Sequence, residues 1–316
     1  MNTEAIIQFN NVSKKYKDVQ ALQEVSFSID EGDIFGYIGP NGAGKTTSIK
    51  VMVGLIKDYK GEVLIKGKNI SKSESEIHKL IGFLPQEVGF QEWRTINHAL
   101  ITFGLLSNIP RTQLKERIQE VLELVGLPEL QNKKITHLSG GMKQKLRLAQ
   151  AILHDPEILI LDEPLTGLDP TSRFQMKNII KKLGARGKTI LFSSHILSDV
   201  QDIASHIGIL NRGKLLNYGT PKQLQDVFRV GNDIEIKIDN DSEKLLELRK
   251  VTNVISLSKI NSEKYLIKLA PNADIDDTIQ EILQFLLKEK VKIRNFNFLT
   301  PSLEEVYLKY VQEEET

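Results

Sequence analysis

Short apolar runs alternate with longer amphipathic segments over most of the chain. The segments 33–39, 156–164 and 188–195 contain apolar runs of strand length, which is typical of strands buried on both faces of a parallel sheet. The segment 45–56 instead repeats apolar residues at the spacing of one helix face. Strands that alternate with helices predict an α/β fold in which a parallel sheet is flanked by helices.

Further elements complete the first 230 residues. Strands are expected at 5–9, 25–30 and 61–70, and a hairpin at 207–219. The segment 97–125 is predicted to be mostly helical, with breaks at Gly104 and Pro110. An apolar stripe in this segment is best explained by packing against a neighbouring helix, and consists of Leu114, Ile118, Val121, Leu122 and Val125.

After about residue 230 the pattern becomes that of a small α+β domain. Four short strands are expected, at 233–239, 253–260, 264–270 and 292–298. One helix should begin after Asp274 as its N-cap, and a last helix should carry Pro301 in its first turn. We therefore expect a larger domain over 1–228, with a helical subdomain at about 87–150, and a smaller domain over 229–316.

The composition indicates a globular protein that needs a partner for any role in a membrane. Of 316 residues, 40% are hydrophobic and 26% charged, and the net charge is +1. No long basic run occurs, which argues against nucleic-acid binding. The absence of cysteine excludes disulfides and thiolate metal sites and suits a reducing compartment. No secretory signal is evident, and the apolar runs fall short of the roughly 18–20 residues that span a bilayer.

A glycine-rich segment begins the helix at 45–56. Residues 39–46 fit the pattern G-x-x-x-x-G-K-[ST] at every fixed position. Glycines let backbone N–H groups face phosphate oxygens, and the helix N-terminus adds partial positive charge. Lys45 would reach the β- and γ-phosphates, and the Thr46 hydroxyl would ligate Mg²⁺. The expected phosphate-binding residues are Gly39, Pro40, Asn41, Gly42, Ala43, Gly44, Lys45, Thr46 and Thr47.

Two acidic residues follow the apolar run at 158–161. Asp162 and Glu163 could simply be surface acids at the end of a strand. In a chain with a phosphate loop they have a second interpretation. Asp162 would orient the Mg²⁺ shell, and Glu163 would polarise a water for attack on the γ-phosphate.

A second candidate anion site lies at LSGGM, residues 138–142. Ser139 is a good N-cap, and Gly140 and Gly141 leave backbone N–H groups accessible at a helix start. Taken alone, this segment is most simply a helix cap.

Together these motifs resemble those of the ABC transporter ATPase family. Residues 39–46 resemble its Walker A motif, 158–163 its Walker B motif and 138–142 its LSGGQ signature. The resemblance covers roughly residues 5–225 and implies a P-loop NTPase fold with a mixed sheet and a helical subdomain. It also implies functional residues outside these motifs: Gln86 at the Mg²⁺ or the attacking water, Asp169 in the D-loop, His195 at the γ-phosphate and Tyr16 stacked on adenine.

The resemblance implies ATP and Mg²⁺ as ligands and a mechanism that uses two chains. ATPases of this family dimerise head to tail, and each ATP lies between one chain's Walker A motif and the other chain's signature. Both half-sites look complete here, so a homodimer is expected. The signature ends in Met142 rather than glutamine, which puts in doubt only the contacts of the glutamine side chain.

The C-terminal segment narrows the resemblance. Residues 300–311, TPSLEEVYLKYV, are similar to the ending of ATPases from exporters in which a soluble ATPase pairs with a separate permease. This similarity implies a cytoplasmic protein, peripheral on the inner face of the membrane. The permease contact is expected at 87–106, where Trp93 and Phe103 accompany Ile96, Leu100 and Leu105, although ordinary packing explains these residues equally well.

The sequence fits two other functions less well than transport. An ABC ATPase acting on a ribosome or on DNA is disfavoured because the chain has one ATPase half and no heptad insertion. A binding or scaffold protein with a dead site is disfavoured because Lys45, Asp162, Glu163 and His195 are all intact.

Overall fold

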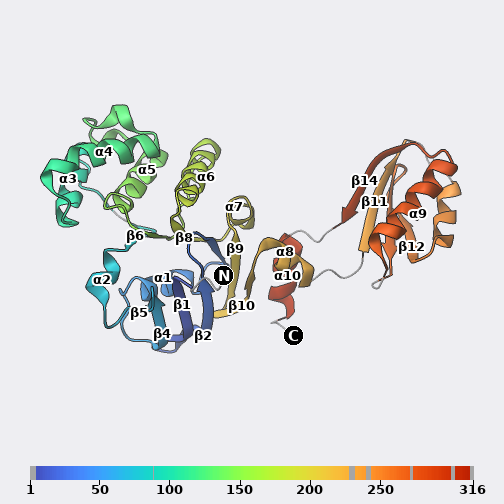
Figure 1. Cartoon of the computed structure of the whole chain (residues 1–316), viewed down its shortest axis with the longest axis horizontal. Helices are drawn as coiled ribbons and strands as arrows, with labels where there is room; N and C mark the ends of the chain where they lie inside the picture. Colours follow the sequence, from blue (N-terminus) through green and yellow to red (C-terminus); the bar gives the residue numbers. More distant parts are fainter. Residues whose placement is uncertain are drawn as a thin grey trace. The chain divides into compact units, whose positions relative to one another are not determined.

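The chain forms two compact units, which divide between Pro221 and Lys222 (Figure 1). The computed structural model describes residues 5–87, 89–227, 232–239, 243–270, 273–299 and 303–313. The domain boundary expected at 228/229 lies a few residues after this division and stays a prediction.

A six-stranded sheet forms the centre of the first unit. Its order is β10 (Lys214–Gly219), β9 (His206–Asn211), β3 (Ile34–Ile38), β8 (Thr189–Ser194), β7 (Ile158–Leu161) and β6 (Ile81–Leu84). All neighbours are parallel except β10, which runs antiparallel to β9. The carboxyl ends of β3, β7 and β8 therefore meet at one edge, where ligands bind in open α/β sheets.

A smaller antiparallel sheet packs against this centre. Its order is β2 (Val19–Ile29), β1 (Ile7–Tyr16), β4 (Lys60–Ile65) and β5 (Lys68–Asn69). Aromatic rings join the two sheets in one buried core, since Phe27 of β2 lies 5.1 Å from Phe9 and 5.2 Å from Phe35 of β3 between ring centroids. The predicted mixture of parallel and antiparallel strands is confirmed.

Helices cover the central sheet and form a separate group. Helices α6 (Pro170–Ala185) and α7 (Leu197–Gln201) connect strands of the central sheet. Helix α1 (Lys45–Met52) instead leads from β3 to the antiparallel sheet, and α2 (Glu74–His78) leads from that sheet back to β6. The helices α3 (Ile96–Leu106), α4 (Arg111–Val125) and α5 (Gly140–Ala151) lie together, away from the antiparallel sheet (Figure 1). Two 3-10 turns, Pro128–Leu130 and Ile135–His137, connect α4 to α5.

The α3–α4 pair confirms one sequence prediction and corrects another. All five residues of the predicted apolar stripe on α4 are buried. Pro110 is the N-cap of α4, as a helix break requires. Gly104, however, lies inside α3, so the break predicted there is wrong. A Cβ at Gly104 would lie 2.2 Å from Leu114 Cδ2, so this glycine lets the two helices approach closely.

The second unit contains four antiparallel strands in the order β12 (Val254–Lys259), β13 (Lys264–Leu269), β11 (Asn232–Ile238) and β14 (Ile293–Leu299). A 3-10 segment, Glu243–Lys250, follows β11, and α9 (Ile275–Lys288) follows β13. This β-helix-β-β-α-β arrangement is ferredoxin-like. Helices α8 (Pro221–Val227) and α10 (Leu303–Glu313) flank these elements in the sequence.

The second unit agrees with the predicted α+β pattern. Asp274 Oδ1 accepts hydrogen bonds from the amides of Asp276 and Asp277, at 3.1 and 3.2 Å, as an N-cap does. The 3-10 segment was not predicted, and Pro301 lies outside the described residues.

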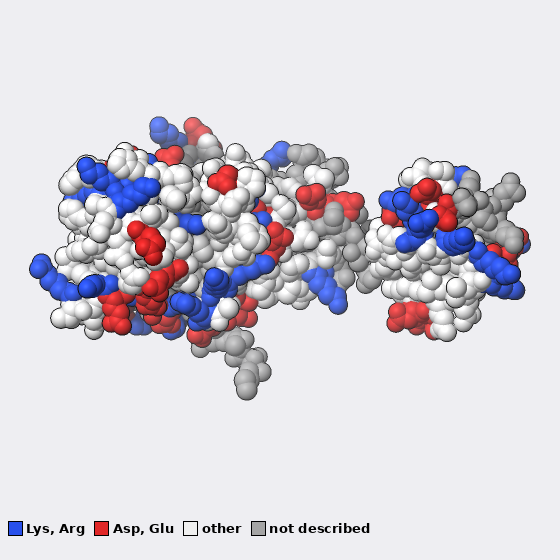
Figure 2. Space-filling view, turned by 90° about the horizontal axis from the view of Figure 1, so that it is seen from above, with Lys and Arg blue, Asp and Glu red and all other residues white. Residues whose placement is uncertain are grey.

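The surface carries charges of both signs, and on the face drawn in Figure 2 basic and acidic side chains are interspersed. Across the described ranges, no helix is at once long and apolar enough to pass through a membrane.

Candidate nucleotide site

The phosphate loop connects β3 to α1. Gly42 has φ 81° and Gly44 has φ 108°, in the left-handed region that favours glycine. A Cβ at Gly39 would lie 2.3 Å from the Leu210 carbonyl oxygen. The loop therefore needs glycine at these positions, and Gly44 is the N-cap of α1.

Lys45 lies within this loop with its charge compensated. Its Nζ donates to the carbonyl oxygens of Gly39 and Pro40, at 2.7 and 3.2 Å. The same nitrogen lies 3.4 Å from Glu163 Oε1, and both side chains are only 6% exposed. The phosphate loop and the acidic pair are thus joined directly.

Asp162 shares one oxygen between two hydroxyl groups. Its Oδ1 accepts from Thr46 Oγ1 at 3.3 Å and from Ser193 Oγ at 2.7 Å. Burial raises the pKa of Asp162, although these hydrogen bonds oppose the shift. Mg²⁺ is commonly bound through one or two protein oxygens together with substrate phosphates, and the adjacent Thr46 hydroxyl and Asp162 carboxylate fit that chemistry.

Glu163 directly follows in a strained conformation, with φ 51°. Its Oε2 accepts from Thr166 Oγ1 at 2.7 Å and lies 2.9 Å from His195 Nδ1. Burial by itself would raise the pKa of Glu163, but these hydrogen bonds and the charge of Lys45 outweigh burial and lower it. The carboxylate is therefore ionised near neutral pH, as a general base must be.

Lys45, Thr46 and Glu163 border one cavity of about 670 Å³, whereas Gly39, Pro40, Asp162 and His195 are not part of its lining. The predicted residues that line it are Asn41, Gly42, Ala43, Gly44, Lys45, Thr46, Thr47, Gln86 and Glu163. Gln86, which is exposed, comes from the segment after β6. The cavity reaches to Val19, whereas Tyr16, its partner across the β1–β2 pair, is 44% exposed and is not part of the lining.

The signature and D-loop residues form a second group. Ser139 Oγ accepts from the amide of Met142 at 3.2 Å, which is an ordinary N-cap of α5. Asp169 caps α6 in the same way, accepting from the amide of Ser172 at 3.0 Å. A Cβ at Gly141 would lie 2.2 Å from Ser172 Oγ, so the two helix starts pack closely. Within this chain, Ser139, Gly140, Gly141 and Asp169 do not line the phosphate-loop cavity.

Three polar residues that were not predicted support the acidic pair. Ser193 bonds Asp162 and also accepts from the amide of Glu163 at 2.8 Å. Thr166 donates to Glu163. Gln144 of α5, 6% exposed, donates to the carbonyl of Pro164 at 3.0 Å. Gln144 could have been found, because it is a polar residue at a buried helical position.

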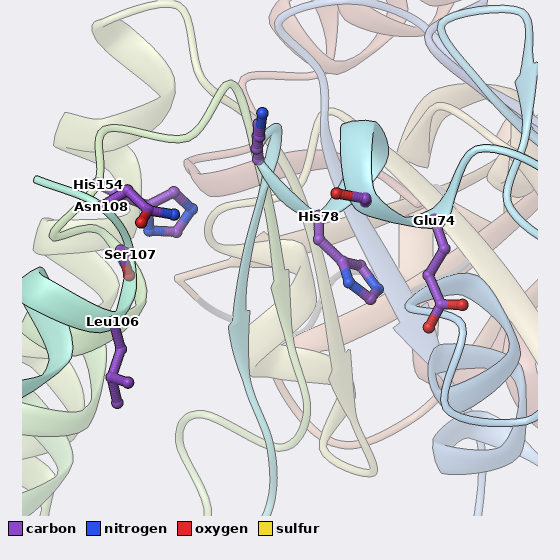
Figure 3. Close-up of a pocket in the computed structure, with 8 residues that line it drawn as sticks. Glu74, His78, Leu106, Ser107, Asn108 and His154 are labelled. Carbon is purple, nitrogen blue, oxygen red and sulfur yellow. The ribbon is translucent and has the colours of Figure 1, made fainter.

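A larger cavity, of about 910 Å³, contains none of the predicted site residues. Figure 3 shows Glu74 and His78 on one side of it and Leu106, Ser107 and His154 on the other. His78 and His154 each place Nε2 near a backbone carbonyl, at 3.0 and 3.1 Å. Burial lowers the pKa of His154, so this wall of the cavity carries no added positive charge at neutral pH.

Two family patterns match the chain. The ABC transporter family matches residues 22–166, and the family described as "ATP-binding protein DrrA1-3-like, C-terminal domain" matches residues 219–311. The first match lies within the first unit, and the second covers most of the second unit.

Bacterial relatives are similar over nearly the whole chain or over about two thirds of it. The ABC transporter ATP-binding protein YxlF of Bacillus subtilis is 34% identical, covering 97% of this chain and 99% of its own. The linearmycin resistance ATP-binding protein LnrL of the same species is 32% identical, covering 96% of this chain and 97% of its own. The bacitracin transport ATP-binding protein BcrA of Bacillus licheniformis is 41% identical, covering 67% of this chain and 68% of its own.

Solved structures agree with this relationship. An ATP-binding subunit of an ABC transporter superposes with a TM-score of 0.64 at 27% identity, covering 71% of this chain and 93% of its own. A dimeric ATP-binding cassette with bound ADP and phosphate has a TM-score of 0.61 at 26% identity, over 68% and 98%. The predicted P-loop fold is therefore confirmed, and the chain belongs to the ABC transporter family as one of its ATP-binding, ATPase subunits.

Proposed function

We propose that this chain hydrolyses Mg-ATP at the phosphate-loop cavity and thereby drives a separate membrane permease of the export type. The observation that carries the proposal is the contact of Lys45, Glu163 and His195 beside that cavity. The family relationship supports the nucleotide as ATP.

Each residue has a distinct part in the proposed reaction. Lys45 would exchange its contact with Glu163 for the β- and γ-phosphates. Thr46, Asp162 and Gln86 would hold Mg²⁺, which neutralises phosphate charge. Glu163, ionised because its pKa is lowered, would accept the proton of the attacking water. His195, released from Glu163, would donate to the γ-phosphate.

A second copy of the chain would complete the site. Ser139, Gly140, Gly141 and Asp169 group together outside the cavity of their own chain, so we propose that they contact ATP bound to the partner. The similar cassette whose structure is a dimer supports this arrangement. Tyr16, close to the cavity through Val19, is proposed to stack on adenine once nucleotide is present.

The permease contact is proposed on the helical subdomain. Trp93 is 65% exposed and Leu106 73% exposed, and Leu106 also lines the cavity in Figure 3. Ile96 and Leu100 are buried and belong to the packing of the subdomain. A cytoplasmic segment of the permease would cover the exposed residues, which would hold the chain on the inner face of the membrane. The names of LnrL and BcrA favour export.

The alternative is an ABC ATPase that acts on a soluble complex such as a ribosome. Both functions are tested by measuring ATP hydrolysis of the purified chain alone, with ribosomes, and with a candidate membrane protein partner. We expect stimulation by the membrane protein only, and loss of hydrolysis in Lys45→Ala. Stimulation by ribosomes alone would favour the alternative, and an inactive wild-type chain would contradict the proposed function.

A further inference from the structure

Asp199 is a buried acidic residue with no role in the reaction proposed above. It lies on α7, four residues after His195, and is 1% exposed. Helix α7 is seated tightly on the central sheet, because a Cβ at Gly36 of β3 would lie 2.1 Å from Val200 Cγ1. A carboxylate in such a place must be compensated by a nearby cation.

Two basic residues of α6 supply this compensation unequally. Lys177 Nζ lies 2.8 Å from Asp199 Oδ1 and also 2.8 Å from Asp202 Oδ2. Arg173, one turn earlier on the same face, has Nη1 3.9 Å from Asp199 Oδ1. Lys177 therefore makes the close ion pair, whereas Arg173 lies at the limit of contact.

The Arg173–Asp199 pair is incomplete. Asp199 Oδ1 contacts Lys177 as an ion pair but has no hydrogen-bond partner among the residues that the structure describes. Arg173 Nε and Asp199 Oδ2 are also buried, and neither has such a partner. Leaving such buried groups unpaired destabilises a fold, and the planar guanidinium is suited to bond both oxygens of a carboxylate. A small approach of the first turn of α6 toward α7 would satisfy both atoms.

That approach would act on two parts of the nucleotide site. The first turn of α6 begins at Asp169, which is proposed to contact the partner's nucleotide site. Helix α7 directly follows the segment of His195, which contacts Glu163. A bond between Arg173 and Asp199 would therefore fix the D-loop residue Asp169 relative to His195.

We propose that Arg173 is a positioning residue that pairs fully with Asp199 when nucleotide is bound between two chains. The closed pair holds His195 and Asp169 in the arrangement that hydrolysis requires. Lys177 compensates Asp199 before and after closure, so its role is in stability. This inference rests on the proposed function of the nucleotide site.

The first experiment compares Arg173→Gln with Lys177→Gln and the control Asp202→Asn in the full chain. We expect Arg173→Gln to lower kcat about tenfold, equivalent to about 1.4 kcal/mol of activation free energy, while KM for ATP and the melting temperature stay near wild type. Lys177→Gln should lower the melting temperature, and Asp202→Asn, whose carboxylate is 59% exposed, should change neither. A wild-type kcat in Arg173→Gln, or a kcat that falls only together with the melting temperature, would overturn the proposal.

The second experiment uses amide hydrogen exchange and needs no turnover. The full chain is measured with and without Mg²⁺ and adenylyl imidodiphosphate. In the wild type we expect added protection at residues 39–47 and at 195–201, and in Arg173→Gln protection at 39–47 alone. Equal protection of 195–201 in both proteins would contradict the role of Arg173. No protection at 39–47 in the wild type would contradict nucleotide binding itself, and with it the inference.

Discussion

Asp162 and Glu163 are neighbours in sequence, yet their surroundings shift their pKa values in opposite directions. Asp162 lies deeper, and burial raises its pKa because it disfavours the ionised form. The hydrogen bonds from Ser193 and Thr46 lower the pKa but do not offset burial. Glu163 faces His195 and Lys45, which together with Thr166 lower its pKa. The opposite shifts follow from the different neighbours of the two carboxylates. The roles proposed for them rest on their contacts with Thr46, Lys45 and His195 and not on these pKa values.

The raised pKa of Asp162 predicts that the native residue destabilises the nucleotide-free chain. A group with a raised pKa in the folded state favours folding when protonated, so its ionisation costs stability as pH rises above the unfolded pKa of about 3.9. We expect Asp162→Asn to raise the melting temperature at pH 7 by about 2–4 °C, the effect of about 1 kcal/mol in a domain of this size, while hydrolysis is lost.

Calorimetry of Asp162→Asn at several pH values checks this prediction. The difference in melting temperature between the variant and the wild type should disappear below about pH 4, where Asp162 is protonated in both the folded and the unfolded state. A variant less stable than the wild type at pH 7, without Mg²⁺ or nucleotide, would show that ionised Asp162 stabilises the fold.

Tyr16 can be tested against a tyrosine of equal exposure. Tyr16→Ala should weaken ATP binding by about two- to tenfold, because an aromatic contact contributes about 0.5–1.5 kcal/mol. Tyr218, which is 43% exposed against 44% for Tyr16, supplies the control, and Tyr218→Ala should bind as the wild type does. Equal affinities in both variants, measured by titration calorimetry, would remove Tyr16 from the site.

At the scale of elements, α5 and the end of β7 are joined by one buried side chain. Gln144 donates to the Pro164 carbonyl at 3.0 Å and accepts from Arg147 Nη1 at 3.0 Å. Helix α5 begins at the signature, and Pro164 directly follows Glu163. This link joins the signature helix to the residue that follows the acidic pair.

Replacing Gln144 should therefore affect stability and turnover together. Gln144→Met keeps the volume but leaves the Pro164 carbonyl unpaired, at a cost of about 1–3 kcal/mol. We expect a lower melting temperature and a reduced kcat in an ATPase assay. The exposed Gln113 of α4 allows a matched control, since Gln113→Met should change neither quantity. A Gln144→Met chain as stable and as active as the wild type would show that the link has no such role.

The regular elements were predictable because their patterns are local. Apolar runs marked the strands β3, β7 and β8, and Asp274 marked the start of α9. Gly104 misled the prediction because glycine in a sequence marks either a break or a close approach, and only the position of Leu114 on the next helix distinguishes the two.

The residues that hydrogen-bond the acidic pair were less predictable, because their contacts join positions distant in sequence. Ser193 reaches Asp162 across 31 residues, and a serine in an apolar strand does not indicate its partner. The phosphate loop itself needed no such contact, since its spacing alone predicts its ligand.

At the scale of the whole molecule, the chain holds two groups of candidate nucleotide-binding residues, which would contact different nucleotides in the proposed dimer. The phosphate loop and Glu163 border one cavity, while Ser139 and Asp169 cap two helices outside it. Within one chain the second group caps two helices, and the proposed dimer would add the contact with a partner's nucleotide. The account therefore depends on two copies enclosing ATP between them.

The most direct test of this claim is light scattering of Glu163→Gln with ATP and Mg²⁺. The variant should bind ATP without hydrolysing it and should form a dimer of twice 35.8 kDa. The control Glu157→Gln, at an exposed position on the same unit, should hydrolyse ATP as the wild type does. A Glu163→Gln chain that binds ATP and stays a monomer at every protein concentration would contradict the account.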